Sequence, residues 1–142
     1  MAKTIIYNSA SASTVFDTDN IAVDESTGNR YINDRDSSTI YRMDSGGTII
    51  TLLTGHQWNV IRFIGGYLYA SKDLGGIYKI TPTPGTSVTT STLAATGSGS
   101  TPWGIAVDTS GNVYVYLIAT HEVKKYAPGS SSGVTVAGGN GN

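Results

Sequence analysis

Residues 102–126 read PWGIAVDTSGNVYVYLIATHEVKKY and contain three β-prone runs separated by turn residues. In the first run, the β-branched side chains of Ile105 and Val107 alternate with a smaller neighbour. The turn that follows ends on Gly111, a residue type that closes short reversals at positive φ. Together, the runs and turns predict three antiparallel strands.

Two further segments of the chain are weaker copies of this stretch. Placing Gly28, Gly65 and Gly111 over one another aligns residues 28–43, 65–80 and 111–126 without a gap. Upstream of each glycine we expect the first strand of the copy, at 19–24, 58–63 and 103–108. Downstream, a Thr- or Val-rich run is expected to form an outer strand, at 48–53, 88–93 and 134–136. A period of about 40 residues built from four short strands is typical of a β-propeller blade.

The sequence therefore predicts an all-β propeller with three four-stranded antiparallel blades in its 142 residues. The expected division is an N-terminal outer strand and connector at 1–19, followed by blades at 20–54, 55–97 and 98–142. The last blade includes the C-terminal tail. The β-prone run at residues 4–7 is a fourth candidate for an outer strand. Residues 4–7 and 134–136 thus compete for the outer position of the third blade.

GIAVDTSGNVYV, followed by HEVKKY, resembles the NHL repeat, which is the blade of a six-bladed β-propeller. The resemblance extends over about residues 20–142 and is strongest in the third copy and weakest in the second. NHL repeats usually follow the second strand with Asp and precede the third strand with Arg. Asp34 keeps the acid, whereas the third copy has Leu117 and Glu122. The resemblance implies half of a six-bladed ring.

The composition limits the kinds of partner. Charged residues make up 13% of the chain and the net charge is −1, so there is no basic footprint for nucleic acid or an acidic membrane surface. The absence of cysteine excludes disulfides and cysteine-ligated metals. Apolar runs are too short to span a membrane, and the N-terminus lacks the basic start of a signal peptide. We expect a soluble protein without a signal peptide, in a compartment that the sequence leaves undetermined.

Asp24 and Asp108 each close the first strand of a copy, where the second copy has Phe63. Two carboxylates near a propeller axis are a possible Ca²⁺ site, but turn capping is the favoured interpretation, because a turn glycine follows each within a few residues. The sequence contains no nucleophile motif, zinc-ligand set or phosphate-binding loop. We therefore expect no cofactor and no catalytic residues.

Five aromatic and apolar residues are the candidate ligand-binding residues. Trp58 and Trp103 recur before the first strand of two copies, where they either fill gaps between blades or stack on a flat ligand such as a sugar. Tyr116, Leu117 and Ile118 form an apolar run where the other copies are more polar. This run either makes a contact surface or packs under a neighbouring blade.

These observations favour a non-enzymatic propeller half that assembles into a closed ring and serves as a binding or scaffold module. Three blades form an open arc whose end faces would expose Val, Ile and Tyr side chains, so a homodimer with six blades is expected, ahead of a trimer with nine. A glycan or a protein is the expected ligand. A carbohydrate-binding propeller is the alternative, and a metal-dependent hydrolase or lyase is a second one.

Overall fold

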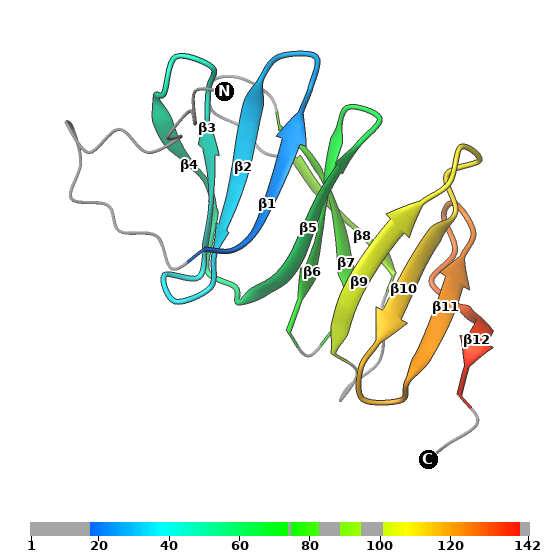
Figure 1. Ribbon diagram of the computed structural model, residues 1–142. Coiled ribbons are helices and arrows are strands. Elements are labelled where there is room, and N and C mark those ends of the chain that lie inside the picture. The colour runs from blue at the N-terminus through cyan, green and yellow to red at the C-terminus, as the bar shows by residue number, and fades with distance from the viewer. Residues whose placement is uncertain (1–17, 74, 83–88, 95–100, 140–142) are drawn as a thin grey trace, which may run out of the picture.

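The computed structural model describes residues 18–73, 75–82, 89–94 and 101–139. These residues form three four-stranded antiparallel sheets, which confirms the predicted fold class. The sheets follow one another in chain order (Figure 1). None of the described residues belongs to a helix long and apolar enough to cross a membrane.

In every sheet the order of the strands in space is their order along the chain. The strands of the three sheets are, in turn, β1 Thr18–Asp24, β2 Asn29–Asp34, β3 Thr39–Met43 and β4 Ile49–Thr54; β5 Trp58–Ile64, β6 Tyr67–Lys72, β7 Ile77–Thr81 and β8 Thr89–Ala94; β9 Pro102–Val107, β10 Val113–Leu117, β11 Glu122–Tyr126 and β12 Val134–Gly138. The outer position of the third sheet is held by β12, while residues 4–7 lie outside the described residues.

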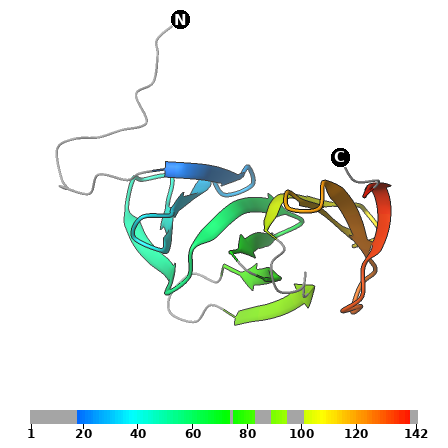
Figure 2. The same cartoon turned by 90° about the horizontal axis from the view of Figure 1, so that it is seen from below.

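The first strands of the sheets lie next to one another, with β1 beside β5 and β5 beside β9. Figure 2 shows the sheets fanned out one after another, with β12 at the far edge of the third. In a propeller, the innermost strands of neighbouring blades meet in this way around the axis. The first strand of each sheet is therefore its inner strand.

Each inner strand carries a β-bulge at the same place. The pairing with the second strand skips Asp19 in β1, Asn59 in β5 and Trp103 in β9. Asn59, and not Trp58, is therefore the structural equivalent of Trp103. Trp58 corresponds instead to Pro102, since both precede the bulge.

The gapless alignment of the sequence copies is thus wrong by one residue in the second copy. Register places Gly66, and not Gly65, at the position of Gly28 and Gly111, and all of these glycines have positive φ. The residue equivalent to Asp24 and Asp108 is Ile64, not Phe63. Two adjacent glycines fit the same turn in sequence, and only the strand pairing distinguishes them.

The apolar core lies between the sheets. We call the face of a sheet that turns toward its N-terminal neighbour the front face, and the opposite one the rear face. Ala22, Tyr31 and Ile40 on the rear face of the first sheet pack against Ile61 and Leu68 on the front face of the second. The junction between the second and third sheets repeats this packing, with members Val60, Tyr69, Ile77, Ile105, Val113, Val115, Leu117 and Tyr126. Burial of each Val, Leu or Ile side chain in these junctions stabilises the fold by about 1.5–3 kcal/mol.

Candidate ligand-binding site

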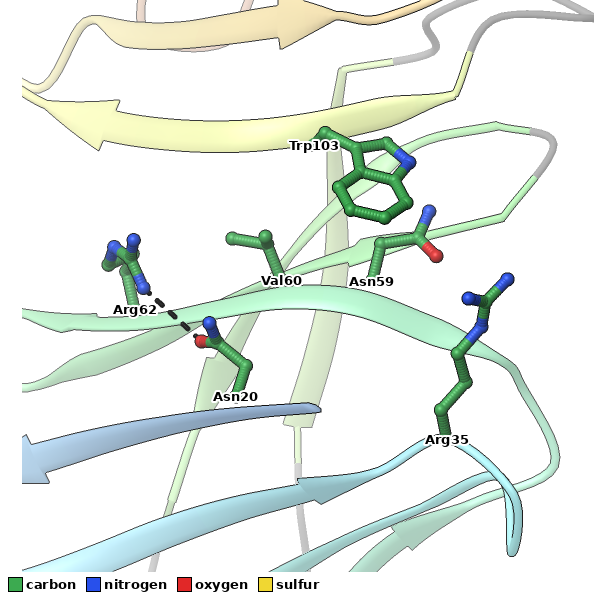
Figure 3. A pocket seen from close by; sticks show the side chains of 6 residues that line it. All are labelled: Asn20, Arg35, Asn59, Val60, Arg62 and Trp103. Atoms are coloured by element: carbon green, nitrogen blue, oxygen red, sulfur yellow. Dashed lines mark hydrogen bonds between the residues drawn. The ribbon is translucent and has the colours of Figure 1, made fainter. Parts of the chain in front are cut away.

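A cavity of about 260 Å³ opens at the inner strands (Figure 3). Its walls come from all three sheets, because they include β1, the turn after β2, β5 and β9. The lining residues are Asn20, Arg35, Asn59, Val60, Arg62 and Trp103. We call this cavity the inner-strand pocket.

The inner-strand bulges bring two of these side chains to the pocket. Asn59 and Trp103 are the bulge residues of β5 and β9, and both line the cavity. A bulge adds one residue to a strand and re-aims a side chain that regular pleating would place elsewhere. Trp103 consequently remains 48% exposed although it lies within a paired strand.

Asn59 leaves one buried hydrogen-bond acceptor unused. Its Nδ2 donates to Oδ1 of Asp73 at 3.3 Å and to the carbonyl oxygen of Pro102 at 3.5 Å, which fixes the orientation of the amide. Among the described residues its Oδ1 has no partner, although the residue is only 9% exposed. Buried polar atoms in folded proteins are nearly always paired, and an unpaired one costs about 1–3 kcal/mol. A ligand that donates a hydrogen bond here would remove that cost.

Two guanidinium groups give the pocket a positive charge. Arg62 donates from Nη1 to Oδ1 of Asn20 at 3.2 Å and to the carbonyl oxygen of Ile61 at 3.0 Å, both of which are neutral acceptors. Within the described residues, Arg62 makes no ion pair, whereas Arg35 lies 3.5 Å from a carboxylate oxygen of Asp73. Arg62 therefore presents a cation to the pocket that no carboxylate of the described residues neutralises.

The five predicted ligand-binding residues are not brought together. Trp58 is completely buried and packs edge-on against Tyr78, with ring centroids 5.5 Å apart. It therefore offers no face to a ligand. Leu117 is also buried, in the junction between the second and third sheets. Among the five, only Trp103 lines the pocket.

Tyr116 lies elsewhere, on β10 of the third sheet, and Ile118 lies in the turn that follows this strand. Tyr116 is 37% exposed at the position that Asn33 and Ser71 occupy in the other two sheets. The side chains of Asn33 and Ser71 donate to backbone carbonyl oxygens of the next sheet: to Trp58 at 2.8 Å and to Pro102 at 3.1 Å. We call this register position the cross-sheet position. It connects each of the first two sheets to its successor.

Asp24 and Asp108 both accept hydrogen bonds within their own turns. Asp24 accepts from the Ser26 and Thr27 hydroxyl groups, at 2.6 Å each. Asp108 accepts from the backbone and side-chain amides of Asn112, at 2.8 and 2.7 Å. These bonds lower the pKa of each carboxyl group, chiefly through the Ser26 hydroxyl at Asp24 and the Asn112 side chain at Asp108. In the described part of the chain, no three His, Asp or Glu residues gather as a metal-binding group.

Sequence reasoning missed four pocket residues with polar side chains: Asn20, Arg35, Asn59 and Arg62. One signal was available at Arg62. In the corrected register its equivalents are Ala22 and Ala106, so an arginine replaces alanine on an inner strand. The sequence alignment set Arg62 against Val23 and Val107, where an arginine is equally unusual, so the signal was present in either register.

Comparison with known proteins supports the fold but no particular function. No protein-family model matches the chain, and no curated protein matches it. Among solved structures, YCF48 from Cyanidioschyzon merolae, a β-propeller, is similar with a TM-score of 0.68 at 11% identity over 87% of this chain. A structure of YCF48 bound to D1 peptide gives 0.60 at 14% identity, also over 87%.

A protein of unknown function from Bacteroides caccae is similar over 86% of the chain, with a TM-score of 0.58 at 17% identity. The chain spans 42%, 41% and 47% of the length of the YCF48, peptide-bound YCF48 and Bacteroides structures, respectively. At these identities the likeness shows the fold alone. The chain has a β-propeller fold.

Proposed function

We propose that this chain is a binding scaffold of the NHL-like propeller type that completes its ring with a second copy of itself. The proposal rests on one contrast between equivalent positions. Ile21, Ile61 and Ile105 share a register position on the front faces of the three sheets. Ile61 and Ile105 are 0% and 7% exposed because a preceding sheet covers them, whereas Ile21 is 49% exposed.

The rear face of the third sheet has the complementary surface. At the cross-sheet position, Asn33 and Ser71 are fully buried by the following sheet, but Tyr116 is well exposed. Within the described residues, no sheet follows the third one. The two end faces thus have the same register positions as the two surfaces that pack together inside the chain. Covering them recovers about 25 cal/mol for each Å² of apolar area.

A second copy fits both end faces at once. If the third sheet of each chain packs on the first sheet of the other, a twofold axis relates the chains and the ring closes with six sheets. Six is the number of blades that the NHL resemblance implies. A trimer with nine sheets would also close and is the second choice.

A binding role is favoured over catalysis by the nature of the site. The inner-strand pocket has a cation, an unused acceptor and an exposed aromatic ring, which are recognition groups, and the described residues contain no metal-binding group. YCF48, which shares the fold, has been solved with a bound peptide. Ligands of a propeller scaffold include proteins and glycans, and both remain proposals for this chain.

Mass measurement in solution tests the assembly. We expect light scattering to give twice the chain mass and the double variant I21D/V23D to give the mass of one chain, because two carboxylates cannot be buried at the junction. Ser131→Asp is the control, since Ser131 is exposed in the loop between β11 and β12 and lies on neither end face. A folded wild-type monomer at all concentrations would contradict the proposal, and a threefold mass would replace the dimer by the trimer.

A further inference from the structure

Three features of the inner-strand pocket would each be complemented by a different chemical group of a ligand. The Oδ1 of Asn59, which has no partner in the described part of the chain, needs a hydrogen-bond donor. The guanidinium of Arg62, which meets only neutral acceptors among the described residues, needs an anion. The exposed indole of Trp103 needs an apolar face. A single ligand that satisfies all three must be compact, anionic and rich in hydroxyl or amide groups.

We propose that the pocket binds an acidic sugar, meaning a pyranose ring that carries a carboxylate, as a uronic acid does. This inference rests on the proposed binding function and names its ligand class. The carboxylate pairs with Arg62, whose planar fork matches the two oxygen atoms. A ring hydroxyl donates to Oδ1 of Asn59, and the C–H face of the ring lies against the Trp103 indole.

The arrangement of the side chains suits a chain of such sugars. In Figure 3, Arg62 and Arg35 lie on opposite sides of Asn59 and Val60, and the Trp103 ring lies over the middle of the group. The amide oxygen of Asn59 points to the side of Arg35. Because Arg35 is already paired with Asp73, Arg62 carries the stronger attraction for the first carboxylate. Arg35 is available to a neighbouring acidic unit.

The size of the pocket favours a sugar ring over a peptide. Its 260 Å³ is below the range of about 300–1,000 Å³ that is usual for ligand pockets, so it accepts one compact group. An extended acidic peptide also has carboxylates and N–H donors, but they are spread over several residues, whereas a uronic acid holds a carboxylate and hydroxyl donors on one compact ring. A peptide is therefore an outcome of the test and not part of the proposal.

The test is calorimetric titration of the full chain with digalacturonate and with galactobiose, which has the same rings without the carboxylates. We expect digalacturonate to bind and to protect Trp103 from iodide quenching, and galactobiose to bind at least about tenfold more weakly. Raising the salt concentration should weaken the acid-sugar binding, because the cationic site is open to solvent.

Variants separate the pocket from the rest of the surface. Arg62→Gln and Trp103→Ala alter exposed side chains, and each should weaken digalacturonate binding at least about tenfold. Arg30→Gln is the matched control, because Arg30 lies on β2 outside the pocket, and it should leave binding unchanged. Equal losses in R62Q and R30Q would overturn the proposal.

Two further outcomes would overturn it: equal binding of the neutral and acidic disaccharides, or binding of an Asp-Glu peptide in place of the sugar. The mass of the protein is measured in the same solutions. A dimer that binds peptide but no sugar overturns only this inference. A monomer that binds digalacturonate contradicts the ring assembly and leaves the inference standing.

Discussion

The junctions between sheets and the two end faces of the molecule are made of equivalent residues in different environments. On the front faces, isoleucine occurs three times at one register position, and it is buried in the second and third sheets but half exposed in the first. The side chain is the same in each case, so its burial depends on whether another sheet stands in front of it. The comparison teaches that at this position the front end face has the residue of an interior.

The largest expected effect comes from alanine substitution of the equivalent isoleucines in a junction and on an end face. We expect Ile61→Ala to lower the free energy of unfolding by about 2–5 kcal/mol, because it leaves a cavity in the first junction. Ile21→Ala should cost less than about 1 kcal/mol in the separated chain, where the side chain is half exposed. Urea denaturation at low protein concentration measures both, and similar losses would show that Ile21 is already covered within one chain.

The cross-sheet position gives a smaller and more specific test. Asn33→Ala should lower the free energy of unfolding by about 1–3 kcal/mol, because it removes the donor to the Trp58 carbonyl oxygen in a buried junction. Tyr116→Ala changes the same position where no sheet follows, so it should leave the unfolding of the separated chain nearly unchanged. Its expected effect is weaker self-association, measured by sedimentation at several concentrations. A stability loss as large as that of N33A would contradict the comparison.

The smallest expected effect concerns acid. The first and third sheets have Asp24 and Asp108 where the second has Ile64, and turn hydrogen bonds hold the pKa of both carboxyl groups below the usual 3.8. A lowered pKa in the folded state stabilises it above pH 3.8, and this contribution disappears as the pH falls through the folded-state pKa.

We therefore expect the melting temperature to fall as the pH is lowered from about 5 to about 3, with a smaller fall in the variant D24N/D108N. Thermal melts followed by circular dichroism at several pH values measure the difference. Ser131→Asp adds an exposed carboxyl group in the loop between β11 and β12 and should keep the wild-type dependence. An unchanged slope in D24N/D108N would assign the acid sensitivity to other carboxyl groups.

The strands and their order could be predicted because their signals are local. Alternating side chains and turn glycines act over a few residues, and the same four-strand pattern recurs three times. The register of the second copy was missed for an equally local reason. Gly65 and Gly66 both adopt positive φ, so the sequence offers two equivalent anchors for one turn. Antiparallel pairing of β5 with β6 selects Gly66.

The candidate site depended on non-local contacts. Trp103 was found because an aromatic residue is conspicuous, but its apparent partner Trp58 precedes the bulge and is buried between sheets. Asn59 is unremarkable in the sequence, and the arginine at position 62 does not by itself indicate a pocket. They become a site only when β1, β5 and β9 meet at the inner edge of the sheets.

The sequence by itself determined an all-β chain of repeated four-stranded units, since hydrogen bonding along strands and reversal at glycine turns depend on neighbours in the chain. The tertiary structure alone decided which side chains are covered and which are presented. Gly104 is an example. It pairs with Tyr116, and a Cβ added to Gly104 would lie only 3.2 Å from the Cβ of Tyr116, so a larger residue fits there poorly. In the second sheet the equivalent pair is Val60 and Ser71, so there the larger side chain is on the first strand and the smaller one on the second. Such exchanges of volume are invisible until the strands are paired, because packing depends on the sum of two side chains that lie far apart in the sequence.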